Sequence, residues 1–120
     1  MPAFEGEIAA PPRLDVLEPD LDRPLDVDRA APFTLRWRPE PGHDVFMELV
    51  SGGVTIACSA SDDAGEIVVP TELLELLPRA GGMMGGMLMV SRAARRSLPV
   101  GDGRVTLEAL ATECVMGSVD

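Results

Sequence analysis

Four methionines crowd one short glycine-rich segment of this 120-residue chain. Met83, Met84, Met87 and Met89 lie within the run Gly-Gly-Met-Met-Gly-Gly-Met-Leu-Met, which begins at Gly81. Thioethers are soft ligands that select Cu(I), and a glycine loop could wrap around such an ion. A packing interpretation also fits, in which Met87 and Met89 continue a strand while Met83 and Met84 fill an apolar gap. The segment therefore gives two hypotheses, a copper site and a structural role.

Carboxylates gather in a second segment, Asp15–Asp28. Oxygen ligands suit Ca²⁺, so calcium is the other metal that this sequence suggests. The segment lacks the spacing of an EF-hand loop, because Arg23 and Pro24 come where further ligands and a turn glycine should follow. Asp62 and Asp63 are a weaker candidate of the same kind. A solvated linker is the competing interpretation.

Nucleophilic catalysis has little support in the sequence. The only histidine, His43, stands beside Asp44 in a Pro/Gly turn. A catalytic base must be held rigidly against its nucleophile and oriented by an acid. We interpret His43 as part of a solvent-exposed turn, and we expect neither an enzyme nor a cofactor.

Two cysteines, Cys58 and Cys114, form an even pair that is consistent with a disulfide in an exported protein. They fall on expected strands that need not be neighbours, so free thiols that behave as small hydrophobes are the favoured alternative.

The charge of the chain restricts its partners. Twenty acids and ten arginines give a net charge of −10, which opposes binding to nucleic acid or to an anionic membrane surface. Arg92, Arg95 and Arg96 form the only basic cluster, either a solvated strand end or a small docking spot for an acidic protein or sulfated glycan.

No apolar run approaches the roughly 20 residues of a membrane-spanning helix. The first twelve residues lack the features of a signal peptide.

Alternation of apolar and polar residues predicts the elements that position these groups. Phe33, Leu35 and Trp37 alternate with polar residues and should face a core that also holds Ile56. Turn signals recur about every 8–12 residues, the spacing of a β-sandwich. The expected strands are 14–17, 33–37, 45–50, 54–59, 66–69, 87–93 with a possible extension to 100, and 104–115; residues 18–31 are expected to be a loop or sheet edge.

One short helix interrupts the strands. Thr71–Leu77 switches to helical spacing, with Thr71 as its expected N-cap and Pro78 as its end. The alternation of the last strand falters at Ala109 and Leu110, which suggests a β-bulge. We expect a flexible segment 1–13 and a single domain over 14–120.

The pattern Leu35-x-Trp37-x-Pro39, a Pro/Gly turn and then an alternating strand resembles the second and third strands of fibronectin type III and related immunoglobulin-like domains. The chain departs from that family in lacking tyrosine and in its short helix. The resemblance implies an all-β sandwich of about seven strands. It also implies a non-enzymatic module that binds protein or glycan through loops or an edge strand, since such modules mostly act in recognition.

The expected interaction loops contain Pro41, His43, Asp62, Asp63, Arg95 and Arg96. A periplasmic-type metal-binding protein, using the methionines or the acidic segment, is the alternative function. The hypothesis of a protein- or glycan-binding module fits a periplasmic, secreted or cell-surface protein. A cytoplasmic location stays open.

Overall fold

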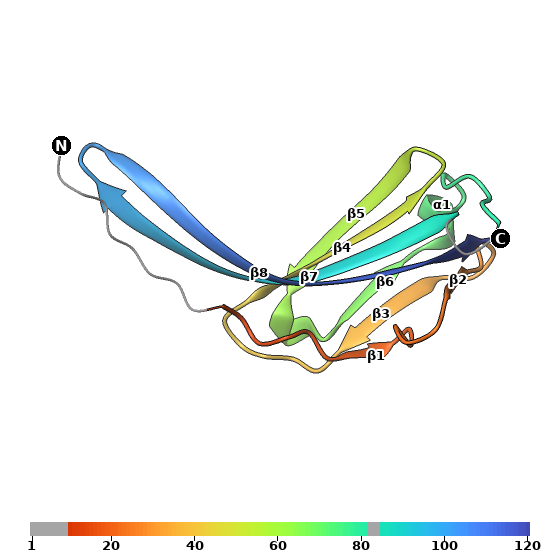
Figure 1. Cartoon of the computed structure of the whole chain (residues 1–120), viewed down its shortest axis with the longest axis horizontal. Coiled ribbons are helices and arrows are strands. Elements are labelled where there is room, and N and C mark those ends of the chain that lie inside the picture. The colour runs from red at the N-terminus through yellow and green to blue at the C-terminus, as the bar shows by residue number, and fades with distance from the viewer. Residues whose placement is uncertain (1–9, 82–84) are drawn as a thin grey trace.

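The computed structural model of the chain describes residues 10–81 and 85–120. Strands hold 59% of the described residues and helices 6%, so the predicted all-β class is confirmed. Figure 1 shows two layers of strands and a long hairpin that projects beyond them. The strands are β1 (Val16–Glu18), β2 (Leu25–Val27), β3 (Phe33–Trp37), β4 (Asp44–Ser51), β5 (Val54–Ser61), β6 (Glu66–Val69), β7 (Gly86–Val100) and β8 (Gly103–Val119).

The strands form two sheets. The smaller sheet has the order β1-β3-β6, and the larger has the order β2-β8-β7-β4-β5. All neighbouring strands run antiparallel except β2, which lies parallel to the end of β8. Antiparallel sheets can bury one face and leave the other in water, which matches the alternation in β3, β4 and β5.

The core lies between the two sheets, and Trp37 is its largest side chain. Trp37 is 1% exposed, and Leu35 beside it is fully buried. Phe33 and Ile56 complete the predicted core set, with 9% and 8% of their surfaces exposed. These side chains face the core because every second residue of a pleated strand points to the same face of the sheet. The predicted core residues are therefore confirmed.

Several boundaries differ from the prediction. The first strand is Val16–Glu18 rather than 14–17, and the expected loop or edge 18–31 contains the edge strand β2. Helix α1 (Thr71–Leu74) is shorter than expected, and its N-cap is Pro70 with no side-chain hydrogen bond, so Thr71 as cap is wrong. The predicted bulge at Ala109 and Leu110 is also wrong, because the β7–β8 register runs unbroken from Gly86↔Gly117 to Val100↔Gly103.

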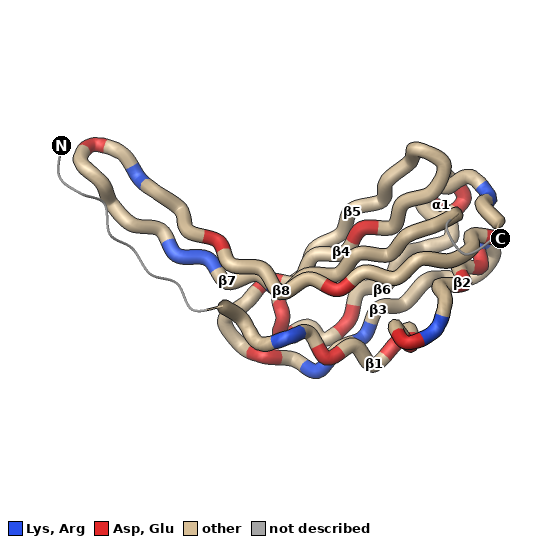
Figure 2. Tube along the Cα trace, viewed as in Figure 1, with Lys and Arg blue, Asp and Glu red and all other residues tan. Residues whose placement is uncertain are grey.

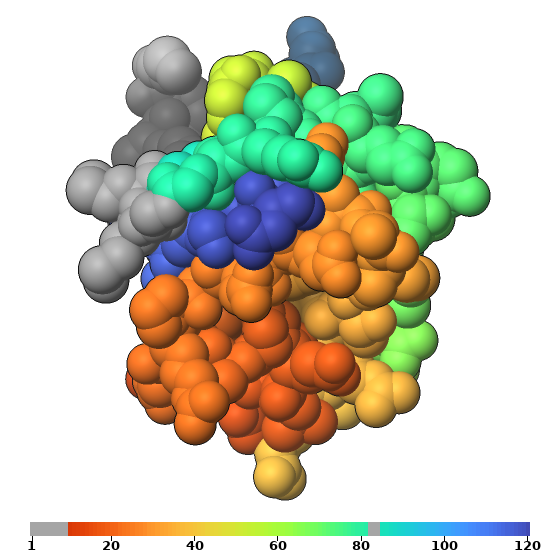
Figure 3. Space-filling model, turned by 90° about the vertical axis from the view of Figure 1, so that its right-hand side faces the viewer, coloured from red at the N-terminus to blue at the C-terminus, as the bar shows by residue number. Residues whose placement is uncertain are grey.

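The end of the molecule opposite the projecting hairpin closes around the last residues of β8. Ala80 forms an isolated bridge with Val119, and β2 pairs with residues 117–119 of β8. Figure 3 views this end and shows the end of β8, in blue, between the segment near residue 80 and the β2 region in orange. Gly117 permits this packing, because a Cβ there would lie 1.8 Å from the backbone oxygen of Leu25.

The projecting hairpin makes the molecule long. Its extents are 54 × 28 × 24 Å, and its radius of gyration is 16.9 Å, against about 13.6 Å for a compact chain of this length. The pairing of β7 with β4 ends at Ala93, while the pairing of β7 with β8 continues to Val100. We call residues 94–110 the arm. No helix in the described residues has the length and hydropathy to cross a membrane.

Candidate functional site

The arm carries backbone edges that no other described strand covers. β8 pairs with β7 along its whole length, but on its other side it pairs with a described strand only through residues 117–119. Beyond Ala93, β7 has no second neighbour among the strands that the structure describes. Unpaired N–H and C=O groups on such edges are a template for another extended chain. β8 therefore offers the free edge 104–116, and β7 offers a shorter one.

The two faces of the arm differ in polarity. Leu98 lies opposite Val105, and Ala94 lies opposite Ala109, all half-buried and in phase with the core-facing residues of β7. This mostly apolar face also carries Arg96, opposite Leu107. On the other face, Arg95 Nε donates to Glu108 Oε2 at 2.7 Å, and both side chains are exposed. Two-stranded hairpins are only marginally stable alone in water. An amphipathic arm with open edges is suited to receiving a third strand.

A buried ion pair fixes the base of the arm to the short turn Asp62–Ala64, which connects β5 to β6. Arg92, the last inward-facing residue of β7 before the arm, is 1% exposed and donates from Nε to Asp62 Oδ2 at 2.6 Å. Asp62 also accepts from Trp37 Nε1 at 2.9 Å and from the Glu40 backbone N–H at 2.9 Å. The remaining guanidinium nitrogens donate to the carbonyls of Pro12, Arg13 and Arg38.

The environment of Asp62 changes its acidity. Burial alone would raise the pKa of this carboxyl, but hydrogen bonds from Arg92, the Glu40 backbone and Trp37, with the Arg92 charge, lower it below its ordinary value. Asp62 is therefore a permanent anion at neutral pH. Because every oxygen is already occupied by these donors, the pair acts as a structural clamp rather than as an acid or base.

The predicted interaction residues separate into buried and exposed groups. Asp62 is fully buried, so its assignment to an interaction loop is wrong. Arg92 is also part of the predicted basic cluster, but it is buried, which rules out a docking role for this residue. His43 is half-buried rather than solvent-exposed, with Nδ1 3.7 Å from Asp62 Oδ2 and 3.4 Å from the Glu40 carbonyl oxygen. The candidates that remain exposed are Pro41, Asp63, Arg95 and Arg96.

The sequence contained a signal for the buried pair. Arg92 follows Leu88 and Val90 at a spacing of two, which places it on the same inward face of β7. A charge in that phase needs a buried partner of opposite sign. Nothing in the local sequence identifies Asp62 as that partner, because the pairing depends on how the two sheets stack.

The sulfur-bearing residues are distributed over both faces of the larger sheet. Met87 and Met89 lie on β7, as the packing interpretation predicted, while Met83 and Met84 lie outside the described residues. Both cysteines are free. Cys58 pairs with the buried Met47 on the inner face, whereas Cys114 pairs with Met89 on the outer face. The cysteines are three strands apart, roughly 14 Å, far beyond disulfide reach.

Burial affects the half-buried thiol of Cys58. It raises the pKa of Cys58 above the ordinary value of a thiol. A thiol in this state is a poor nucleophile at neutral pH.

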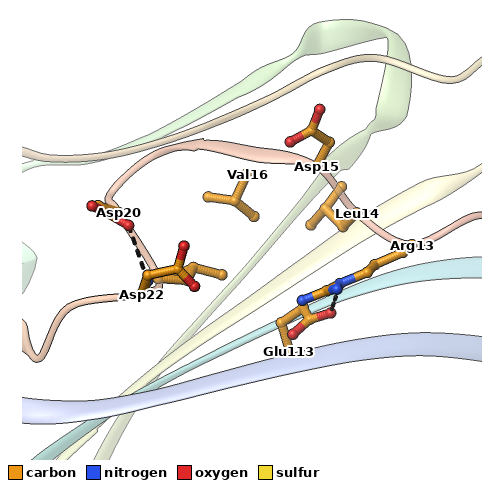
Figure 4. A pocket seen from close by; sticks show the side chains of 8 residues that line it. Arg13, Leu14, Asp15, Val16, Asp20, Asp22 and Glu113 are labelled. Carbon is orange, nitrogen blue, oxygen red and sulfur yellow. Dashed lines mark hydrogen bonds and ion pairs between the residues drawn. The ribbon is translucent and has the colours of Figure 1, made fainter.

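A surface hollow lies between the segment around β1 and strand β8 (Figure 4). Within it, Arg13 is paired with Glu113, and the Asp22 backbone N–H donates to Asp20 Oδ1 at 3.0 Å. Its lining is mainly carboxylate, with Arg13 as its one basic side chain. The residues that line it are Arg13, Leu14, Asp15, Val16, Asp20, Leu21, Asp22 and Glu113.

Histidine, cysteine and carboxylate side chains do not gather in a group of three or more suited to a metal anywhere in residues 10–81 and 85–120. The comparisons with protein families, curated proteins and solved structures give no match to this chain.

Proposed function

We propose that this chain is an immunoglobulin-like module that binds a partner protein by adding a strand of the partner to its β7–β8 arm. The observation that carries the proposal is the arm itself, 94–110, where the β7–β8 ladder continues after β4 has ended. Its open edges supply backbone hydrogen bonds, and its apolar face supplies shallow contacts for alternate side chains of the added strand.

The strand order supports the immunoglobulin-like assignment. The smaller sheet has the order β1-β3-β6, which under this proposal would correspond to strands A, B and E. The order β8-β7-β4-β5 corresponds to strands G, F, C and C′ of the second sheet. In that fold, the extended β7–β8 hairpin is the F–G hairpin, whose loop is a frequent site of recognition.

A protein partner is favoured over a glycan by the residues that the arm presents. Sugar rings stack on exposed aromatic faces, but this chain has only three phenylalanines and one tryptophan. Trp37 is buried, and the guanidinium of Arg95 covers the ring of Phe46 at 5.1 Å from its centroid. Backbone edges and aliphatic side chains suit an extended peptide instead.

Charge further restricts the partner. The arm holds Arg95, Arg96 and Arg104 against Asp102 and Glu108, while the rest of the chain holds seven arginines and eighteen acids. Figure 2 shows basic and acidic residues on the arm and many acidic residues, with some basic ones, over the body. An acidic or neutral extended segment can approach the arm, and a strongly basic one would be drawn to the body instead.

A proline on the outer edge of β8 tests this proposal. Val100 and Gly103 close a two-residue hairpin, so Thr106 directs its backbone N–H away from β7. Thr106→Pro should block strand addition while leaving the body folded, and Thr106→Ala is the matched control. The partner would be captured with the wild-type chain, purified, and titrated by calorimetry against both variants.

We expect Thr106→Pro to weaken binding by about tenfold or more, since several backbone hydrogen bonds of about 1 kcal/mol each are lost. Hydrogen exchange provides an independent readout, because amides of residues 104–116 that point outward should become protected only in the complex. Equal binding by both variants, with no change in protection on β8, contradicts strand addition.

A further inference from the structure

The structure brings four sulfur atoms onto two successive rungs of the β7–β8 ladder. Met89 lies directly opposite Cys114, and Met87 lies directly opposite Met116. The two rungs are separated by two residues along each strand, so all four side chains point to the same face of the sheet. Only two of these residues belong to the methionine-rich segment. Cys114 and Met116 come from β8, almost thirty residues away.

This face is the outer, solvent-facing side of the larger sheet. The residues between them on β7 and β8, Leu88 and Val115, point inward, and Leu88 is fully buried. Cys114 is exposed, and Met116 is 39% exposed. A sheet with one wet face should carry polar residues there, as β5 does with Thr55 and Ser59. Four sulfur side chains at adjacent outward positions, with Met87 and Met89 half-buried, depart from that rule.

The spacing allows the four sulfurs to converge. Directly opposite residues in an antiparallel pair have Cβ atoms about 5 Å apart, and residues two apart on one strand are separated by about 6.7 Å. Methionine has three rotatable side-chain bonds and adapts its thioether position. The Cys114 thiol is short, so an ion held here would lie above Cys114, with the longer thioethers of Met87, Met89 and Met116 reaching toward it.

We propose that Met87, Met89, Cys114 and Met116 form a surface site for one soft monovalent cation of the Cu(I) type. A set of three thioethers and one thiol selects Cu(I) and excludes Ca²⁺ and Mg²⁺, which require oxygen. Glu48 on β4 lies opposite Met89 and adds a negative charge at the margin. The net charge of −10 also attracts cations.

Binding is coupled to proton release. The Cys114 S–H bond breaks, a Cu–S bond forms to the thiolate, and the proton passes to solvent; copper remains Cu(I), so no electron is transferred. Thioether ligands carry no proton, so the released proton comes from Cys114 alone.

The test is an anaerobic titration of the full chain with Cu(I), kept reduced by ascorbate, in competition with a chromogenic Cu(I) chelator. We expect one ion per chain in native mass spectrometry and a dissociation constant tighter than about 1 µM. Met89→Leu with Met116→Leu should weaken binding by at least tenfold. Cys114→Ser should do the same.

Two controls define the site. Cys58→Ala removes the thiol on the opposite face, and Met83→Leu with Met84→Leu removes the other thioethers of the glycine-rich segment. Both should bind Cu(I) as the wild type does. All these variants leave the arm intact, so the result does not depend on partner binding. Affinity weaker than about 1 µM, unchanged binding by Cys114→Ser, or loss of binding in either control overturns the proposal.

Discussion

At the scale of single residues, the structure depends most on the buried contacts of Trp37, Asp62 and Arg92. Trp37 fills the space between the sheets and donates its indole N–H to Asp62, and Asp62 accepts from Arg92. A buried carboxylate is tolerated only when donors surround it, and here side chains and a backbone N–H supply them. The network links β3, β7 and the turn after β5, which are remote in sequence.

Replacing Trp37 separates its packing role from its hydrogen bond. Trp37→Ala should reduce the free energy of unfolding by about 3–5 kcal/mol through the cavity it leaves. Trp37→Phe keeps most of the apolar volume but removes the donor to Asp62, and should cost about 1–3 kcal/mol. Urea unfolding measures both, and an effect of Trp37→Ala below about 1 kcal/mol is inconsistent with a buried anchor.

The ion pair should show strong coupling in a double-mutant cycle. Arg92→Met and Asp62→Asn should each destabilise the fold by about 3–5 kcal/mol, because each leaves a buried charge without its partner. The double variant should cost clearly less than the sum of the two, since neither charge remains. Additive effects in urea unfolding argue against a direct buried pair.

The lowered pKa of Asp62 predicts a pH dependence of stability. A carboxyl whose pKa is lower in the folded state contributes stability above its unfolded pKa of about 3.9. This contribution is lost as the pH falls from the pKa of the unfolded state toward the lower pKa of Asp62 in the folded state. The difference in unfolding free energy between wild type and Asp62→Asn should therefore shrink below about pH 4. A difference that stays constant through this range is evidence against the shifted carboxyl.

At the scale of elements, Gly117 decides whether β2 can join the larger sheet. A Cβ at Gly117 would overlap the backbone of Leu25, which cannot yield as a flexible side chain could. Gly117→Ala should separate β2 from β8 and destabilise the fold by about 1–3 kcal/mol. Gly103→Ala is the matched control on the same strand, since its nearest contact is an ordinary 3.6 Å. Hydrogen exchange of 25–27 should accelerate only in Gly117→Ala.

The elements that the sequence predicted well are those whose patterning is local. β3 and β6 agree with their expected bounds, because alternation and flanking turns define them. β2 was harder to identify, since Leu25 and Val27 are two apolar residues within an acidic segment. Their strand forms only because the end of β8 is available to pair with them. The regular register at Ala109 likewise depends on β7 and not on the side chains of β8.

At the scale of the whole molecule, the arm and the body are separable. No other described strand pairs with the arm, and the body keeps all of its β4 and β2 contacts without it. Replacing residues 95–108 with Asn-Gly should therefore leave a cooperative unfolding transition close to that of the wild type. Small-angle X-ray scattering should show a fall in the radius of gyration from 16.9 Å toward about 13 Å. Loss of cooperative unfolding contradicts an independent body.

The sequence by itself determined the all-β class, the core phase of Phe33, Leu35 and Trp37, and the strongly acidic character of the chain, because period-two patterning and composition are local properties. The tertiary structure decided which residues meet. It buried Asp62 with Arg92, left β7 and β8 extending beyond the body, and placed Cys114 and Met116 beside Met89 and Met87. Those contacts depend on strand register and sheet stacking, which join residues distant in sequence and which no local pattern specifies.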